Sequence, residues 1–220
     1  MFMQEEREQV VSYGRKMSQD RLTAGTSGNI SILDREKGYM AISPSGIGYF
    51  DVRPEDVVIM DLDANIVDGN RKPSSEWALH TAFYKKRADA GAVVHTHSIF
   101  CTTLSVLGEP IRPVHYMMAD AGVKEIPLAP YVTFGTKELA DAAMQAIGGS
   151  KAVLLANHGI IVCGENIESA YGLAVNLEFT AEIQWRAEAC GTPHVLTDSE
   201  MDAALLRFRH YGQPKEKQEK

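Results

Sequence analysis

The sequence has few of the features that mark membrane, secreted or nucleic-acid-binding proteins. No apolar run approaches the roughly 18 residues that span a bilayer, and the acidic stretch after the first three residues does not suit a signal peptide. Basic side chains number 22 against 29 acidic ones, and this net charge of −7 opposes binding to nucleic acid or to an anionic membrane. We therefore expect a cytoplasmic protein that binds neither.

Cysteine is scarce as well. Cys101, Cys163 and Cys190 are odd in number and widely spaced, so they form neither a disulfide framework nor a Cys-x-x-Cys metal motif. We expect each to be a reduced, buried residue that behaves as a small apolar side chain. The phosphate-binding pattern Gly-x-x-x-x-Gly-Lys-Ser/Thr is also missing, which argues against nucleotide hydrolysis.

What the chain does have is the composition of an ordinary globular protein, with 45% hydrophobic and 23% charged residues. We predict one α/β domain over residues 1–212 and a flexible polar tail over residues 213–220. The hydrophobic pattern predicts helices over residues 4–19, 74–88, 100–107, 136–147, 167–190 and 199–210. It predicts strands over residues 30–33, 39–43, 57–61, 92–97, 152–156 and 160–163.

Two histidines one residue apart, His95 and His97, follow the apolar run of a buried strand. Side chains on a strand alternate between its faces, so both imidazoles point the same way, with Cβ atoms roughly 6.5–7 Å apart. Both could then reach one metal ion. His158 lies in a turn between two predicted strands, which we expect at the sheet edge, and it would complete the three-ligand set that catalytic zinc sites use. The alternative for each is a hydrogen-bonded histidine without a metal. The remaining histidines are expected to be structural: His80, His115, His194 and His210.

Three polar segments at the ends of predicted elements form a second group. They are Thr26–Asn29, Ser45–Gly46 and Ser74–Ser75. Backbone N–H groups and hydroxyls at such positions are suited to hold a phosphate, although each segment also fits an ordinary turn or helix cap. Glu76 follows Ser75 directly, and we expect it in the first turn of a helix, where the helix dipole favours a carboxylate.

Together and in this order, five motifs resemble the class II, zinc-dependent sugar-phosphate aldolase family, which also contains the adducin head domain. The motifs are residues 25–31, 43–46, 73–77, 93–97 and 157–159. Segments 113–118 and 126–136 look most like the fuculose-phosphate aldolases of that family, and the resemblance covers about residues 5–212. It implies a single domain with a central, mainly antiparallel β-sheet flanked by helices, in a homotetramer whose active sites lie between subunits.

The resemblance also assigns roles to individual residues. It implies that Zn²⁺ is bound by Glu76, His95, His97 and His158. It implies that the substrate phosphate is held by Thr26, Gly28, Asn29, Ser45, Gly46, Ser74 and Ser75. Glu76 would also act as the general base, Tyr116 would reach the neighbouring subunit's site as a proton donor, and Tyr211 would close over the site.

The implied reaction is the reversible cleavage of a ketose 1-phosphate to dihydroxyacetone phosphate and an aldehyde. L-Fuculose 1-phosphate, which yields L-lactaldehyde, is the first candidate, and ribulose 1-phosphate or a deoxy analogue stays open. Zn²⁺ would act as a Lewis acid, and we expect an apolar surround such as Trp77 to raise the pKa of Glu76 once it leaves the metal. Asp120 departs from the family, because we expect a small apolar residue there. It is either a solvated loop charge or a residue that alters the aldehyde end of the pocket.

Three alternatives have distinguishing features. A Schiff-base aldolase needs a lysine in an apolar environment, and no lysine stands in an apolar strand of this sequence. An epimerase or dehydratase on the same scaffold would share the metal histidines and differ in its acid–base residues. A non-catalytic module like the adducin head would have lost the metal ligands, whereas this chain has all four candidates.

Overall fold

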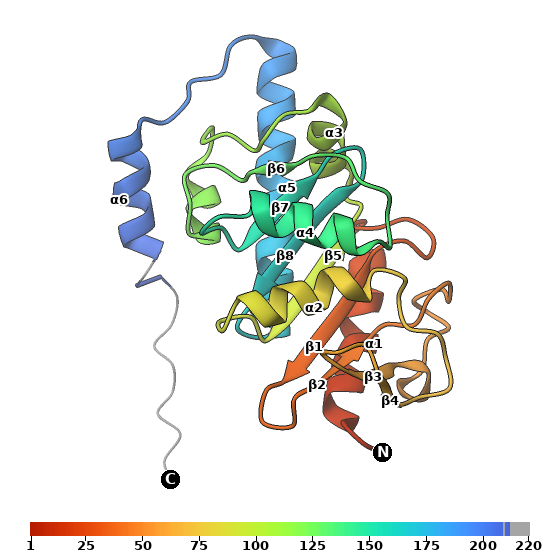
Figure 1. The fold of residues 1–220 in the computed structure, drawn as a ribbon. Helices are drawn as coiled ribbons and strands as arrows, with labels where there is room; N and C mark the ends of the chain where they lie inside the picture. The colour runs from red at the N-terminus through yellow and green to blue at the C-terminus, as the bar shows by residue number, and fades with distance from the viewer. Residues whose placement is uncertain (209, 212–220) are drawn as a thin grey trace.

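One sheet of eight strands forms the centre of the computed structural model, which describes residues 1–208 and 210–211 (Figure 1). The strands are β1 (Asn29–Asp34), β2 (Tyr39–Ile42), β3 (Val58–Asp61), β4 (Ile66–Asp68), β5 (Ala92–Thr96), β6 (Leu128–Ala129), β7 (Ala152–Leu155) and β8 (Gly159–Gly164). Their order is β4-β3-β2-β1-β5-β8-β7-β6, and only the β6–β7 pair is parallel. The predicted α/β fold with a mainly antiparallel sheet is confirmed. The boundary predicted at residue 212 and the tail after it lie outside the described residues.

Helices cover both faces of this sheet. They are α1 (Gln4–Gln19), α2 (Trp77–Lys86), α3 (Ile99–Leu107), α4 (Lys137–Ala146), α5 (Ile167–Cys190) and α6 (Asp198–Phe208). Helices α2 and α4 pack against one face, and α1, α3 and α5 pack against the other. Helix α6 stands at one side, where it packs on the short 3-10 helix η2 (Tyr116–Ala121) (Figure 1).

Strand β5, at the middle of the sheet, is buried along its whole length. Val93 packs into the core under α2 and α4, whereas Val94 packs into the core on the opposite face. A strand covered on both sides is apolar at every position, as the sequence of β5 is up to its histidines. Because side chains alternate, His95 lies on the same face as Val93, which is the face that α2 covers.

The helix that follows Glu76 starts later than predicted. The sequence favoured a start near residue 74, but α2 begins at Trp77. The N–H of Trp77 donates to the carbonyl of Ser74 at 3.2 Å in a turn, and Glu76 has φ −101° and ψ 18°. Glu76 is therefore the residue just before the helix, not a member of its first turn, and this position turns its side chain toward the end of the sheet.

The segment between residues 110 and 134 contains elements that the sequence did not resolve. Its four prolines, Pro110, Pro113, Pro127 and Pro130, favour an extended loop with brief strands. The structure adds the turns of η2 beside the two-residue strand β6. Strand β4, three exposed residues at the outer edge, was not predicted either. By contrast, the predicted bounds of α1 and α5 agree with the structure, because both helices carry a sustained apolar stripe.

Two expectations about surface and composition can be compared with the structure. All three cysteines are free, but Cys190 is exposed, whereas Cys101 and Cys163 are buried as expected. Cys190 is the last residue of α5, where the helix extends past the sheet and loses its packing partners (Figure 1).

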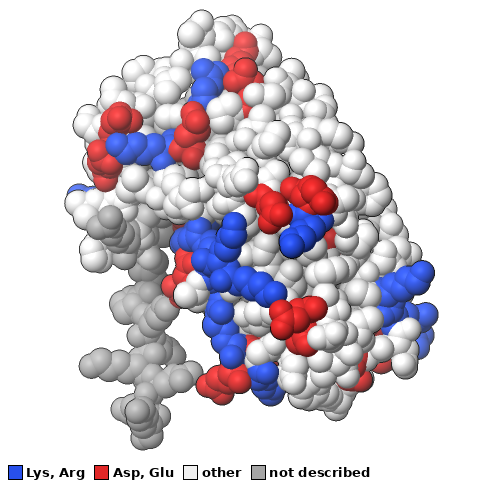
Figure 2. Space-filling model, in the orientation of Figure 1, with Lys and Arg blue, Asp and Glu red and all other residues white. Residues whose placement is uncertain are grey.

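On the face drawn in Figure 2, basic atoms gather near the middle and are bordered by acidic ones. None of the helices in the described residues combines the length and apolar character needed to cross a bilayer.

Candidate metal centre

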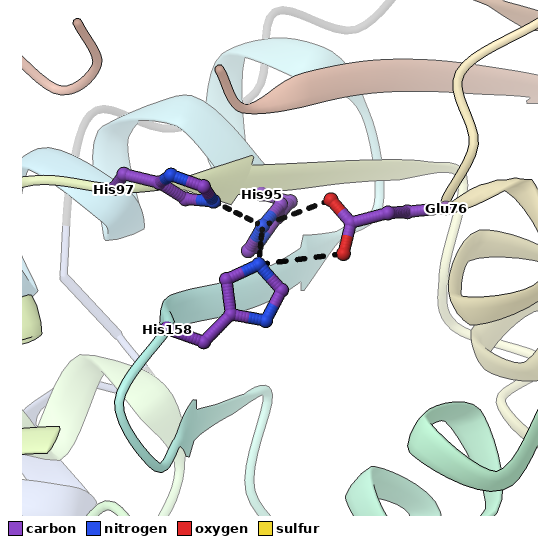
Figure 3. A group of neighbouring side chains, drawn as sticks. All are labelled: Glu76, His95, His97 and His158. Carbon is purple, nitrogen blue, oxygen red and sulfur yellow. Dashed lines mark hydrogen bonds and ion pairs between the residues drawn. The ribbon is translucent and has the colours of Figure 1, made fainter. Parts of the chain in front are cut away.

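Four side chains singled out by the sequence converge at one end of the sheet (Figure 3): Glu76, His95, His97 and His158. His95 lies in β5 and His97 lies one residue beyond it. The antiparallel register sets the end of β5 against the start of β8, and the turn between β7 and β8 carries His158. Both β7 and β8 are inner strands, so His158 lies at the strand ends and not at the outer edge of the sheet. The left-handed φ of 55° at Asn157, which asparagine tolerates, makes this turn tight.

The polar atoms of this cluster face one another. His95 Nε2 lies 3.0 Å from His97 Nε2 and 3.2 Å from His158 Nε2. Glu76 Oε2 lies 3.2 Å from His95 Nε2, and Glu76 Oε1 lies 3.4 Å from His158 Nε2. Ligands about 2.0–2.1 Å from a zinc ion stand about 3.3–3.4 Å apart at the corners of a tetrahedron. The spacing of the four side chains therefore fits a metal ion at the centre of the group.

Contacts behind the cluster fix the orientation of His95. Its Nδ1 lies 2.9 Å from the carbonyl oxygen of Ile160, and since a carbonyl only accepts, Nδ1 carries the proton. The lone pair of the neutral ring is then on Nε2, the atom that faces the other histidines. Metal-binding histidines are commonly held in this way by a backbone carbonyl on their second nitrogen.

The electrostatics of the cluster keep two of its histidines neutral. Burial and, second to it, a charge on His95 lower the pKa of His97 to about 3 and that of His158 to about 4. Neutral imidazole is the form that binds a metal. For His95, burial lowers the pKa, but the Glu76 carboxylate raises it by more.

Glu76 does not have the apolar surround that the sequence suggested. Burial raises the pKa of its carboxyl, but His95 and His158 and the amide of Asn29 lower it by more, so that the net direction is downward. In the metal-free arrangement the pKa of Glu76 is therefore lowered, and the pKa expected for Glu76 beside a bound ion stays a prediction. Glu76 Oε1 is nevertheless buried without a hydrogen-bond partner. A buried, unsatisfied carboxylate oxygen is costly unless a further ligand completes its surroundings, and a bound cation would do so.

A cavity of ≈ 360 Å³ opens beside the cluster, and Glu76, His97 and His158 line it. All of the predicted phosphate-binding residues line it too: Thr26, Gly28, Asn29, Ser45, Gly46, Ser74 and Ser75. The structure thus brings three segments that are far apart in the sequence to one cavity beside the metal cluster.

Backbone hydrogen bonds join two of these segments. Pro44 and Pro73 form an isolated antiparallel bridge, the N–H of Ser45 donates to the carbonyl of Lys72 at 2.9 Å, and the N–H of Ser74 donates to the carbonyl of Ser43 at 3.0 Å. The segment before β1 is held differently, since the Tyr49 hydroxyl donates to the carbonyl of Gly28 at 2.7 Å.

Gly28 is required where it stands. Its φ is +74°, and a Cβ there would lie 2.8 Å from the carbonyl oxygen of His95. The close approach of this loop to the end of β5 therefore depends on glycine.

The side chain of Asn29 has other partners than the resemblance implied. Its Nδ2 donates to Glu76 Oε2 at 3.0 Å, and its Oδ1 lies 2.5 Å from His80 Nε2. The residue borders the cavity, but its amide is directed at Glu76.

Tyr116 and Tyr211 are not part of this cavity. Both line a second one of ≈ 520 Å³ next to α6, together with Asp120, Asn176 and Phe208. Tyr116 is 55% exposed and Tyr211 is 83% exposed. Asp120 is only partly exposed, and its Oδ2 accepts a hydrogen bond of 3.0 Å from Asn176, so it is not a fully solvated loop charge. A role for either tyrosine at a neighbouring subunit's site stays a prediction.

The sequence did not indicate several residues of the cavity beside Glu76, His97 and His158, which we call the metal cavity. Tyr131, Val132 and Phe134 form its apolar wall. Tyr49 supports Gly28, and His80, expected to be structural, contacts Asn29. The spacing of four between Glu76 and His80 was the available signal, because residues i and i+4 of a helix share a face.

Comparisons with known proteins agree with this fold. The chain belongs to the class II aldolase and adducin N-terminal domain family, whose sequence profile matches residues 8–185. It is 48% identical over 213 residues to a 5-deoxy-D-ribulose 1-phosphate aldolase of Bacillus thuringiensis serovar kurstaki, covering 97% of this chain and 100% of that protein. It is 40% identical over 205 residues to an L-fuculose phosphate aldolase of Escherichia coli K12, covering 93% and 94%.

A solved structure named L-fuculose 1-phosphate aldolase superposes with a TM-score of 0.91 at 43% identity, covering 93% of this chain and 96% of that one. With relatives named aldolases at such identity over nearly their whole length, the chain is a class II aldolase, a carbon–carbon lyase of the fuculose- or ribulose-phosphate type.

Proposed function

We propose that this protein is a zinc-dependent aldolase that reversibly cleaves a ketose 1-phosphate to dihydroxyacetone phosphate and an aldehyde. One observation carries the proposal. The group of Glu76, His95, His97 and His158 opens into the same cavity as the Gly/Ser/Thr segments at residues 26–29, 45–46 and 74–75. A metal site and an anion site side by side suit a substrate with a phosphate close to a carbonyl.

The four residues of the cluster would hold the ion, which when bound supplies Lewis-acid polarisation of the substrate carbonyl. Backbone N–H groups and hydroxyls around Ser45 and Ser75 would hold the phosphate, which fixes the end of the substrate that carries it. In the direction of synthesis, Glu76 would take the proton from the carbon next to the carbonyl of dihydroxyacetone phosphate. Its Oε1, buried and without a hydrogen bond, would be the atom that takes the proton once Glu76 no longer binds the ion.

Schiff-base chemistry is disfavoured by the positions of the lysines. None of the lysines in the described residues is buried, and the walls of the metal cavity contain none. A lysine that forms a Schiff base needs a desolvated surrounding that lowers its pKa.

For the substrate, we rank 5-deoxy-D-ribulose 1-phosphate ahead of L-fuculose 1-phosphate. The relative named for the former is 48% identical to this chain, against 40% for a relative named for the latter. The same cleavage between C3 and C4 gives dihydroxyacetone phosphate from both and leaves acetaldehyde or L-lactaldehyde. The two substrates therefore differ only at the aldehyde end.

A panel of ketose 1-phosphates, assayed for dihydroxyacetone phosphate with and without added Zn²⁺, tests this proposal. We expect zinc-dependent release, with the higher kcat/KM for 5-deoxy-D-ribulose 1-phosphate. Zinc-independent release that borohydride traps as a covalent adduct would contradict the metal mechanism. Consumption of a sugar phosphate without release of dihydroxyacetone phosphate would indicate an epimerase or dehydratase.

A homotetramer with shared active sites is part of the proposal. It rests on Tyr116 and Tyr211, which lie exposed at a cavity away from the metal cluster. Light scattering measures the mass of the assembly, and a monomer with full activity would contradict it.

A further inference from the structure

A chain of buried polar groups leads from the metal cluster into the core between α2 and β1. It runs from Glu76 through Asn29, His80 and Ser31 to Tyr84. Asn29 Nδ2 lies 3.0 Å from Glu76 Oε2, and Asn29 Oδ1 lies 2.5 Å from His80 Nε2. Ser31 Oγ lies 2.6 Å from His80 Nδ1 and 2.7 Å from the Tyr84 hydroxyl. His80 and Ser31 are 0% exposed.

This chain of contacts joins two sets of regularly spaced polar residues, one beside and on α2 and the other on β1. His80 and Tyr84 are spaced by four and share one face of α2, and Glu76, just before that helix, stands four residues before His80. Asn29 and Ser31 are spaced by two and share one face of β1. Where the two faces pack, a polar side chain from the strand alternates with one from the helix. Five polar groups placed in sequence in a core are an arrangement that ordinary packing does not require, because apolar residues fill such space with less desolvation.

The charge on Glu76 sets the direction of every hydrogen bond in the chain. A carboxylate only accepts, so the Asn29 amide presents its NH₂ to Glu76 and its oxygen to His80. His80 Nε2 must therefore carry a proton. Burial lowers the pKa of His80 to about 3, so the ring is neutral and Nδ1 accepts from the Ser31 hydroxyl, which in turn accepts from Tyr84.

A rotated Asn29 amide would fail at both ends. Its oxygen would meet the Glu76 carboxylate, and its NH₂ would meet the N–H of His80, so two acceptors and two donors would face one another. As long as His80 keeps its proton on Nε2, Asn29 has one orientation. Glu76 Oε2 is then held by a fixed donor, and Oε1 is left as the oxygen that faces His158 and the cavity.

We propose that His80 is a positioning residue for the reaction, because it holds the Asn29 amide in the orientation that directs Glu76. This inference rests on the proposed function, in which Glu76 moves the proton. It assigns His80 no contact with the substrate, the phosphate or the ion.

Two substitutions of His80 distinguish a positioning role from an effect of side-chain size. In His80→Gln, the terminal amide nitrogen takes the place of Nε2 and can donate to Asn29. In His80→Asn, the shorter side chain reaches only the place of Nδ1 and the donor to Asn29 is lost. We expect His80→Asn to lower kcat by roughly 10- to 100-fold, with KM for the ketose 1-phosphate unchanged because the phosphate segments are untouched.

His80→Gln should keep a kcat close to that of the wild type. Zinc per chain is measured for both variants, so that kcat is expressed per loaded site. His194→Asn, at an exposed histidine outside both cavities, is the control for histidine replacement. An unchanged kcat in His80→Asn, or equal losses in both variants at position 80, would overturn the proposal.

A second measurement needs neither activity nor a variant that folds. Solid-state NMR of the wild-type enzyme, uniformly labelled with ¹³C and ¹⁵N, reports which ring nitrogen of His80 carries the proton. The signal is assigned through its ¹³C connectivity to Leu79 and Thr81. We expect the Nε2–H form, and an Nδ1–H form would contradict the inference.

The two proposals fail in different ways. If the wild type releases no dihydroxyacetone phosphate from any ketose 1-phosphate, the proposed function is wrong, while the His80 tautomer still tests the hydrogen-bond chain. If the wild type is an active aldolase and His80→Asn is as fast, the function stands and the positioning role is wrong.

Discussion

Two cavities of this protein contain candidate functional residues, and they differ in how deeply those residues are buried. The metal cavity is built on the ends of inner strands, and its charged centre is buried, with Glu76 6% exposed and His95 0% exposed. The cavity next to α6 is built from η2, α5, α6 and Tyr211, and its two candidate residues, Tyr116 and Tyr211, are mostly exposed.

The difference shows what one chain supplies by itself. Hydrogen bonds from β1 and β8 already orient Glu76 and His95 before any ion is added, so the metal cavity is preorganised. Tyr116 contacts only the rings of His115 and Phe208 among the aromatic pairs of the described residues. These contacts leave most of the Tyr116 side chain exposed. In the proposed tetramer, a neighbouring subunit would supply the further contacts that fix its position.

Metal removal should have the largest effect, and it should act on the first cavity alone. We expect chelation, or His97→Ala, to lower kcat/KM by about 10³-fold or more, because the lost carbonyl polarisation amounts to several kcal/mol. Added Zn²⁺ should restore the chelated wild type. Activity of a zinc-free sample, verified by elemental measurement, would contradict the role of the cluster.

Tyr116→Phe should have the next largest effect and should spare the metal. Removing the proposed proton donor should lower kcat by about 10²-fold, while zinc content and thermal stability stay unchanged because the hydroxyl is exposed on the single chain. A variant that keeps wild-type kcat would exclude Tyr116 from the chemistry.

The rigidity of the metal cavity can be tested through a glycine. A Cβ at Gly159 would lie 2.3 Å from the Thr96 carbonyl oxygen and 3.2 Å from His97 Cδ2. We expect Gly159→Ala to reduce the free energy of unfolding by about 1–3 kcal/mol, because β5 and β8 must separate.

The matched control is Gly172→Ala in α5, where a Cβ meets nothing within 4 Å. We expect this change to stabilise the protein by about 0.5–1 kcal/mol, since alanine favours a helix interior over glycine. Urea unfolding of both variants decides the comparison. Equal stability of the two would mean that the strand ends beside the metal tolerate movement.

Asp120→Ala should have the smallest effect, confined to the choice of aldehyde. The substitution breaks the hydrogen bond to Asn176 beside Tyr116. We expect the ratio of kcat/KM for 5-deoxy-D-ribulose 1-phosphate and L-fuculose 1-phosphate to change by roughly tenfold, since one side-chain contact discriminates by about 1–3 kcal/mol. If the ratio of the two kcat/KM values is unchanged, Asp120 stabilises η2 and has no role in the choice of aldehyde.

Elements with a long, regular pattern were predictable from the sequence, and elements set by distant contacts were not. α1 and α5 agree with their predicted bounds. The start of α2 does not, because the preceding residues are held by another part of the chain: the Ser74 N–H donates to the carbonyl of Ser43, and Pro73 forms a bridge with Pro44. The exposed strand β4 has too few residues to give a pattern.

The candidate site divides in the same way. His95 and His97 were placed on one face by the period of a strand, and the two residues do share the cluster of Figure 3. The lowering of the Glu76 pKa was not predictable, because it depends on His95 in β5 and His158 in the β7–β8 turn. Nor was the partner of His80, since a spacing of four on a helix does not say which strand will face it.

By itself, the sequence determined the residues able to bind a metal and a phosphate, because strand period, turn chemistry and the order of motifs are local properties. The tertiary structure alone decided which of them share a cavity, which carboxylate oxygen is left free, and that Tyr116 and Tyr211 stand apart from the metal cluster. The physical reason is that side-chain distances, desolvation and hydrogen-bond direction depend on segments that meet only when the sheet forms.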